Sequence, residues 1–421
     1  MMKKLSCYAA LLLFVLGGVC LSGQSYQNFR EEYDGIRERA RLRLGPLRVI
    51  PVFRLSEVGY DSNVYFREEG SEVVPDFTAT FSPEARGYWL LGSSVILSVT
   101  ENPEYLFYAK EEGLRAFTNS FSTGLRMLAL RSFSLSANYH VLSHVRRATS
   151  ELDQRIQDTL TGGTAGFFFE TPRGTAVGFT GSIEDFRYKD VASGAPDDIY
   201  ALALDRRETS AAVELYYRVF SESFFFAIAG WTRYEFVFLE SAWRDASSFE
   251  VSAGLRFPLL GRARGKLSLG WKSFQPESPE RKSFSGLVAA TDVFFRFGRL
   301  GINLGYVRDN TFSYNESAYY YIDGRIRAGF AFYVAPFFRI DGSVQSGTLD
   351  YPEPQEIWYG GEVFVIDRRE DVHRTFSVGP VVRIAGTVGL GLTYNFYKRI
   401  SNAPGFNVRR NFVGAFLTYE F

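Results

Sequence analysis

Two of the three histidines, His140 and His144, stand four residues apart, a spacing that on a helix would turn both imidazoles toward one metal ion. The surrounding stretch, SLSANYHVLSH, alternates apolar and polar residues and therefore predicts a β-strand. Along a strand these two residues would be about 13 Å apart, which is too far for two ligands of one ion. We therefore predict no metal site here.

The sequence gives equally little support to other kinds of catalytic or cofactor site. A hydrolase would need a serine and an orienting acid beside His140, His144 or His373, and no nucleophile motif is visible. The glycines of GTVGLGLTYNF alternate on a predicted strand with no helix after it, so they do not form a phosphate loop. The acidic residues after the first predicted strand match no calcium-loop spacing; they are Asp61, Glu68, Glu69, Glu72 and Asp76. We predict no enzyme activity, no cofactor and no metal.

The amino terminus has the pattern of a secretory signal. Two lysines precede an apolar run of about 12 residues, shorter than the roughly 20 residues of a membrane-spanning helix, and small residues follow. We predict a signal peptide at 1–23. A lipidated Cys20 is the less favoured alternative, because Val19 is bulky where lipoprotein signals carry a small residue. Both cysteines, Cys7 and Cys20, lie in this segment, so the mature chain would have no thiol chemistry.

Composition excludes further classes of protein. The chain has 40 Phe and 25 Tyr among 421 residues, yet after the signal it has no apolar run near 18 residues, which argues against a helical membrane protein. Removing two signal lysines from 47 basic residues leaves 45 against 47 acidic ones, a net charge of −2 that gives no general attraction to nucleic acid. A large secreted β protein and a closed outer-membrane barrel remain.

From Leu47 onward the chain alternates in runs that are separated in turn by tight turns and by longer, charged loops. This asymmetry is typical of outer-membrane barrels and predicts an all-β, closed, antiparallel up-and-down barrel of about 18 strands, with both termini in the periplasm. The predicted parts are the signal peptide at 1–23, a lead-in at 24–45 and the barrel at 46–421. The lead-in contains a short amphipathic helix pattern, and the sequence leaves open whether this helix plugs the periplasmic mouth or is solvated. One predicted strand spans 200–219, and the single long loop spans 348–371.

Alternation also assigns a face to each strand residue. Apolar residues share one side, and polar and charged residues share the other, as a water-filled lumen would require. The predicted lumen-facing pore residues are Arg126, His140, Glu214, Arg218, Trp231, Arg256, Lys272, Arg325, Arg327 and Arg383. The aromatic clusters SFFFAI, GFFFE and SAYYYI are expected to form lipid-facing girdles, whereas Trp231, Tyr216 and Phe168 are expected to point inward.

The chain ends on an alternating aromatic strand, NFVGAFLTYEF. This ending resembles the signal that the barrel-assembly machinery recognises in bacterial outer-membrane proteins, with matching residues Gly414, Leu417, Tyr419 and Phe421. The resemblance implies that the assembly machinery and outer-membrane lipid are partners, and that the mature protein lies in the outer membrane of a Gram-negative-type envelope.

The stretch LGPLRVIPVFRLSEVGYDSNVYF, followed by DFTATFSPEARG, resembles the opening of the β-barrel porin 2 family. The motif residues that match are Tyr60, Asp61, Asn63, Ser82 and Pro83, whereas Ser62 replaces the usual second acid. The resemblance implies an outer-membrane barrel of about 18 strands. Several such barrels are encoded with capsule or exopolysaccharide machinery, which implies periplasmic polysaccharide-export components as partners.

These expectations combine into one functional hypothesis, a pore that passes a secreted polysaccharide from the periplasm to the cell surface. A general diffusion porin for small solutes is the alternative. A non-conducting surface or adhesin barrel is a third interpretation, although only one loop is long enough to suggest it.

Overall fold

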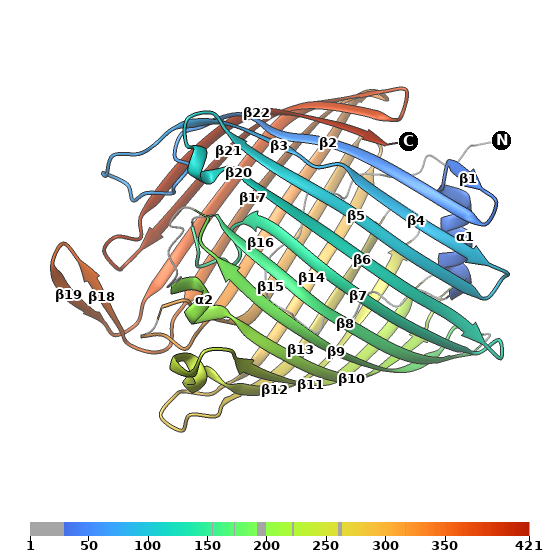
Figure 1. The fold of residues 1–421 in the computed structure, drawn as a ribbon, viewed down its shortest axis with the longest axis horizontal. Helices are drawn as coiled ribbons and strands as arrows, with labels where there is room; N and C mark the ends of the chain where they lie inside the picture. The colour runs from blue at the N-terminus through green and yellow to red at the C-terminus, as the bar shows by residue number, and fades with distance from the viewer. Residues whose placement is uncertain are drawn as a thin grey trace.

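The computed structural model describes residues 29–153, 155–171, 173–191, 199–220, 223–259, 263–315 and 317–420, which form a closed β-barrel (Figure 1). The signal peptide predicted at 1–23 and the terminal Phe421 lie outside the described residues. Among the described residues, no helix is both long and apolar enough to cross a membrane.

The main sheet has 20 strands, among which β1 (Leu42–Leu44) is a short addition to β2. The strands β3 and β4 together form one interrupted wall strand, so 18 strands of the described chain make the wall, each antiparallel to its neighbours. In chain order they are β2 (Leu47–Asp61), β3 (Asp76–Phe81) with β4 (Glu84–Leu91), β5 (Val95–Tyr108), β6 (Ala116–Ala129), β7 (Phe133–Arg146), β8 (Ile156–Glu170), β9 (Ala176–Lys189), β10 (Arg206–Arg218), β11 (Phe224–Phe236), β12 (Ala246–Leu259), β13 (Ala263–Pro276), β14 (Phe284–Phe297), β15 (Leu300–Phe312), β16 (Tyr320–Ala335), β17 (Phe338–Asp350), β20 (Glu370–Ile384), β21 (Val388–Ser401) and β22 (Val408–Glu420). The predicted fold class is confirmed.

The ring closes where the first strand of the wall, β2, pairs with the last, β22. The pairing runs from Val52 opposite Glu420 to Asp61 opposite Phe412, and a bulge interrupts it between Leu55 and Val58. Closure satisfies the edge backbone groups of both strands, which a sheet in hydrocarbon cannot leave unpaired.

Short helices and one hairpin complete the chain at the two ends of the barrel. They are α1 (Phe29–Arg39), η1 (Glu112–Leu114), α2 (Ile199–Leu204), η2 (Leu239–Arg244) and the hairpin of β18 (Gln355–Tyr359) and β19 (Glu362–Ile366). The strand predicted at 200–219 therefore begins too early. Its first residues, YALAL, belong to α2 because alanine and leucine are strong helix formers. The hairpin occupies the long loop predicted at 348–371.

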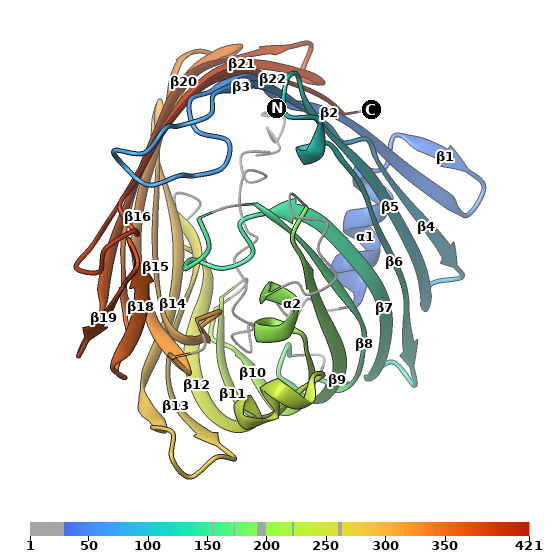
Figure 2. The ribbon, with the colours of Figure 1, turned by 60° about the vertical axis from the view of Figure 1, so that its left-hand side comes forward.

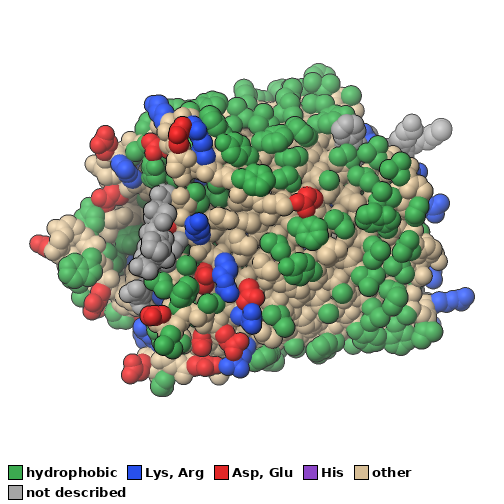
Figure 3. Space-filling model, viewed as in Figure 1, with side chains coloured by type: hydrophobic (Ala, Val, Ile, Leu, Met, Phe, Trp, Pro, Cys, Tyr) green, Lys and Arg blue, Asp and Glu red, His purple; other side chains and the backbone are tan. Residues whose placement is uncertain are grey.

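The outer face of the wall has an apolar belt with a sharp edge toward the loops. On β10, Val213, Leu215 and Tyr217 are exposed on this face, whereas Arg207 at the loop end pairs with Asp185. Figure 3 shows hydrophobic side chains over the turn-end part of the wall and charged side chains gathered toward the loop end. The belt spans about 26 Å along β10, from Thr209 to Tyr217. With a strand tilt of about 40°, its height along the barrel axis is about 20 Å. This height is near that of the apolar band of outer-membrane barrels.

Trp231 is the one predicted pore residue that lies on the outer face. It is 43% exposed and follows Phe225 on the apolar side of β11, opposite to the buried Ile228 and Tyr234 of the inner face. It lies at the edge of the belt, two residues before Arg233. The prediction was wrong, and the placement fits an aromatic residue at a membrane interface.

The aromatic clusters do not all form girdles, contrary to expectation. All three tyrosines of SAYYYI are buried, and Tyr319 and Tyr320 pack against Phe274 and Phe312 inside the loop end of the barrel. In SFFFAI, Phe225 faces outward while Phe224 and Phe226 are buried. Three consecutive aromatic residues cannot all share one face of a strand, because successive side chains alternate.

The belt generates a prediction about Val213, which lies near its middle. Val213→Arg places a charge in hydrocarbon and should lower the free energy of unfolding by about 2–4 kcal/mol. Thr209→Arg, at the belt edge on the same face of the same strand, is the control and should cost about 1 kcal/mol or less. Urea unfolding of the barrel refolded in lipid vesicles measures both; equal losses would contradict the position of the belt.

Candidate functional site

One loop turns into the barrel and crosses it (Figure 2). We call residues 147–153 together with Arg155 the lumenal loop; it connects β7 to β8. The Ser150 hydroxyl donates a hydrogen bond of 2.6 Å to Asp323 on β16. In the ring, β16 is the ninth wall strand from β7 in either direction, so the lumenal loop reaches the opposite wall.

Ion pairs and hydrogen bonds fix the end of the lumenal loop that leads into β8. Asp153 accepts hydrogen bonds from Arg399 at 2.7 Å and from the Tyr397 hydroxyl at 2.6 Å, both on β21. Two residues further on, Arg155 donates two hydrogen bonds, of 2.8 and 3.0 Å, to Glu57 on β2. The bulge of β2 enables this contact, since Glu57 takes a left-handed φ of 52° and the inward side of the strand changes from even to odd positions there.

Glu151 lies at the centre of the lumenal loop and is buried. Its carboxylate accepts hydrogen bonds from the Ser313 hydroxyl at 2.8 Å, the Tyr314 backbone N–H at 2.8 Å and the Tyr351 hydroxyl at 2.9 Å. Burial raises the pKa of the Glu151 carboxyl above its ordinary value of 4.5, although the nearby Arg369 guanidinium and these hydrogen bonds act in the opposite direction. Glu151 thus holds the loop against two further segments of the loop end.

A buried charge cluster supports this contact from the wall. Arg369 and Asp371 are both inaccessible to solvent and form a two-pronged pair with distances of 3.0 and 2.6 Å. Arg399 also pairs with Asp371 and donates a hydrogen bond of 2.7 Å to the Glu151 carbonyl oxygen. Removing one member of such a cluster leaves a buried charge unpaired, so the cluster defines one position for the lumenal loop.

Apolar packing closes the space around the loop. Leu152 and Ala148 belong to a buried cluster with Phe274, Phe312 and Tyr319. In the described part of the chain, side chains therefore fill much of the loop end of the lumen.

A cavity of about 220 Å³ remains beside the lumenal loop. Its lining residues are Phe66, Arg147, Thr375, Asn395, Phe396, Tyr397 and Arg410. The Arg147 guanidinium lies 4.4 Å from the centre of the Tyr397 ring, and that of Arg410 lies 4.7 Å from the centre of the Phe66 ring. Each guanidinium also has a carboxylate partner, Asp153 for Arg147 and Asp61 for Arg410, so the cavity is polar without a large excess of charge.

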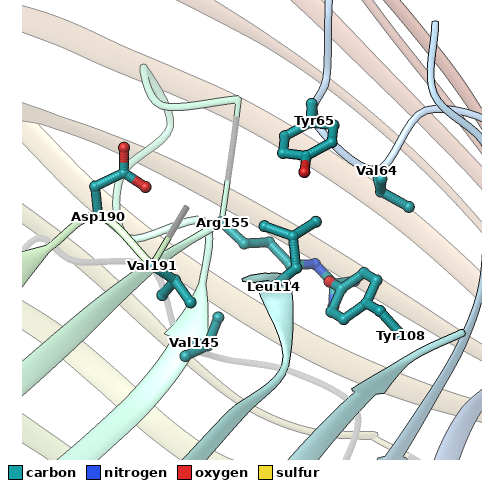
Figure 4. A pocket seen from close by; sticks show the side chains of 8 residues that line it. All are labelled: Val64, Tyr65, Tyr108, Leu114, Val145, Arg155, Asp190 and Val191. Atoms are coloured by element: carbon teal, nitrogen blue, oxygen red, sulfur yellow. The ribbon is translucent and has the colours of Figure 1, made fainter. Parts of the chain in front are cut away.

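A second cavity, between Tyr65, Leu114 and Arg155, measures about 10 Å³ (Figure 4). It has room for about one water molecule. We assign it no solute.

Nine of the ten predicted pore residues lie on the inner face of the wall, and they spread along it rather than forming one site. Several are paired there: Lys272 with Asp309 at 3.0 Å, Arg325 with Asp323 at 2.9 Å and Arg327 with Asp292 at 3.0 Å. The residues on the inner face are Arg126, His140, Glu214, Arg218, Arg256, Lys272, Arg325, Arg327 and Arg383. His140 lies 3.8 Å from Glu184, and the described residues contain no group of three or more His, Cys, Asp or Glu side chains placed to hold a metal ion.

The family-motif residues lie at the closure of the ring. Asp61 is buried and forms a two-pronged ion pair with Arg410 of β22, and the Asn63 amide donates a hydrogen bond of 3.2 Å to the Arg409 carbonyl oxygen. Tyr60 is exposed on the outer face. The motif therefore joins the first and last strands of the wall.

Ser82 and Pro83 separate β3 from β4, where the proline cannot donate to the ladder. The Asn102 amide of β5 donates hydrogen bonds to both, at 2.9 Å to the Ser82 hydroxyl and 2.7 Å to the Pro83 carbonyl oxygen. Three residues of the suggested assembly signal are paired in β22: Gly414 with Gly59, Leu417 with Leu55 and Tyr419 with Phe53. Their recognition by assembly machinery stays a prediction.

The lumenal loop was missed in the sequence. Its charged stretch, ATSELDQRIQD, has the composition of an exposed loop, and no periodicity indicates that Glu151 and Asp153 meet partners about 160 to 250 residues away. The left-handed residue at 57, which brings Glu57 to Arg155, also has no local signal such as glycine or asparagine.

No family model matches the chain, and no curated protein is significantly similar to it. Solved structures are similar in fold. OpdO of Pseudomonas aeruginosa is 11% identical with a TM-score of 0.51, covering 89% of this chain and 96% of that one. A BenF-like porin from Pseudomonas fluorescens Pf-5 is 11% identical with a TM-score of 0.52, covering 90% and 99%. OccK2 (OpdF) of Pseudomonas aeruginosa in complex with glucuronate is 14% identical with a TM-score of 0.51, covering 90% and 98%.

At these identities the likeness concerns the fold, which is that of an outer-membrane porin. A closed barrel with an apolar outer belt is also what residence in an outer membrane requires, so the predicted location is confirmed. The expected porin architecture is supported, whereas the expected association with exopolysaccharide export is not.

The closure contact predicts a specific loss of stability. Asp61→Ala leaves the largely buried Arg410 without its carboxylate and should lower the free energy of unfolding by about 3 kcal/mol, of which the double variant Asp61→Ala/Arg410→Met should recover part. Arg368→Ala removes a pair with Asp350 that is open to solvent and should change little. Urea unfolding in detergent measures all three; an equal effect of Asp61→Ala and Arg368→Ala would contradict the assignment.

The raised pKa of Glu151 predicts a pH dependence. Above pH 4.5 the folded chain keeps a proton that the unfolded chain has lost, so this residue contributes less stability as pH rises through its folded pKa. Glu151→Gln imitates the protonated carboxyl. The unfolding free energy of the variant should match that of the unchanged protein near about pH 4 and exceed it near about pH 8. A difference that is the same at both pH values would refute this.

Proposed function

We propose that the protein is a passive channel of the outer membrane for small polar solutes. The observation that carries this proposal is a closed 18-stranded barrel whose polar interior is crossed by the lumenal loop. A ring of this size leaves room for an aqueous path, and a loop that folds into it reduces the width of that path.

The lumenal loop favours small solutes over a polysaccharide. Its contacts to β2, β16 and β21 hold it across the diameter, and several of them are buried. A polymer chain would need these contacts to break before it could pass. No described feature supports polysaccharide export in particular, so the small-solute alternative replaces it as our preferred function.

The lining of the cavity beside the lumenal loop, which we take as part of the path, indicates the character of the solute. The guanidinium groups of Arg147 and Arg410 have carboxylate partners, which reduces their attraction for free anions, whereas Thr375, Asn395 and Tyr397 offer hydrogen bonds. The cavity is below the roughly 300–1,000 Å³ of drug-sized ligand sites, which favours solutes no larger than about one sugar ring. The similar structure OccK2 (OpdF) was solved with a solute of that size, glucuronate.

Releasing the lumenal loop tests the proposal. Asp153→Ala/Arg155→Ala removes the pairs that hold the last residues of the loop to β21 and β2, and it should raise single-channel conductance in planar lipid bilayers about twofold or more, because the path widens. Arg368→Ala, whose pair with Asp350 is open to solvent, is the control and should conduct like the unchanged protein. If neither the unchanged protein nor the released variant conducts, the barrel is not a channel.

A further inference from the structure

The helix α1 lies inside the barrel, at the end where the tight turns are (Figure 1). Its Phe29 and Ile36 are buried against Leu90 of β4 and Ile96 of β5. Leu90 faces the lumen, because its neighbours Trp89 and Leu91 are exposed on the outer face. The helix therefore packs on the inner side of the wall.

Polar contacts hold α1 at three points around the mouth. Glu32 forms an ion pair with Arg126 of β6, and Glu31 pairs at 3.1 Å with Arg218 of β10. The Tyr33 hydroxyl donates a hydrogen bond of 2.6 Å to the Gly92 carbonyl oxygen in the turn between β4 and β5. Since β10 is the fourth strand after β6, a helix that contacts both strands lies across part of the mouth.

The two acids that hold α1 also favour its helical state. Glu31 and Glu32 lie in the first turn, where negative charge interacts favourably with the helix dipole, and Arg37 and Arg39 lie in the last turn. Arg126 has a second carboxylate, Glu170, at 3.9 Å. Loss of Glu32 would therefore release the helix without leaving Arg126 alone.

We propose that α1 is a plug segment that narrows the turn-end mouth of the channel and opens when its two ion pairs are lost. This inference rests on the proposed function, because a plug has an effect only in a barrel that conducts. It adds a second constriction at the end opposite to the lumenal loop. Arg126 and Arg218, which alternation assigns to the pore, then act by holding this helix.

The test uses the whole chain without its predicted signal peptide, in planar lipid bilayers. Glu31→Gln/Glu32→Gln removes both ion pairs and should raise single-channel conductance about twofold, because the mouth widens. Glu38→Gln removes an exposed acid of the same helix and is the matched control for the loss of charge, with no change expected.

Each result decides the proposal. Equal conductance of Glu31→Gln/Glu32→Gln and Glu38→Gln would overturn it. If the double variant does not fold, Tyr33→Phe, which removes only the hydrogen bond to Gly92, should produce more frequent full openings, and closed times like those of the unchanged protein would overturn the plug. If Glu31→Gln/Glu32→Gln leaves the conductance unchanged while Asp153→Ala/Arg155→Ala still raises it, the plug is refuted and the channel function is supported. If no variant conducts, both proposals are refuted.

Discussion

The requirement that every backbone polar group in hydrocarbon be paired governs this structure. The chain meets it by joining β2 to β22, and the closure is reinforced by Asp61 with Arg410 and by Asn63 with the backbone of β22. The position of the lumenal loop depends on the ring thus formed, since the loop can contact β16, opposite its own strand β7, and also β21 and β2 only if the distances between these strands stay constant. The bulge that turns Glu57 inward belongs to the same closing strand, so the closure and the anchoring of the lumenal loop share one element.

The charged side chains inside the barrel mainly hold the lumenal loop in position, because most of them are paired with one another. Arg369, Asp371 and Arg399 are buried together and form hydrogen bonds with one another, with Gln355 and with the lumenal loop. Buried pairs of this kind add little net stability over apolar packing, but breaking one is costly, which makes them suited to defining a single arrangement. In the channel that we propose, a path lined by paired charges would select solutes mainly by size and hydrogen bonding.

The alternation of apolar and polar residues predicted the wall strands well, because successive side chains face lipid and water in turn. The prediction was wrong where the inner face of a strand does not contact water. The helix α2 and the tyrosines of SAYYYI lie at the loop end, where the inner face packs against apolar side chains instead of water. Trp231 was misplaced because aromatic residues occur on both faces, and parity over a few residues did not fix which one. The lumenal loop depends on contacts between segments far apart in the chain, and no local pattern encodes them.

The central claim is that the barrel encloses a narrowed water path, and permeation of neutral sugars of increasing size tests it most directly. Lipid vesicles containing the purified protein would be exposed to monosaccharides, disaccharides and longer chains, and their osmotic swelling rates compared. We predict fast entry of monosaccharides, slower entry of disaccharides and exclusion of longer chains. Equal entry of long chains, or entry of none of the sugars, would contradict the account.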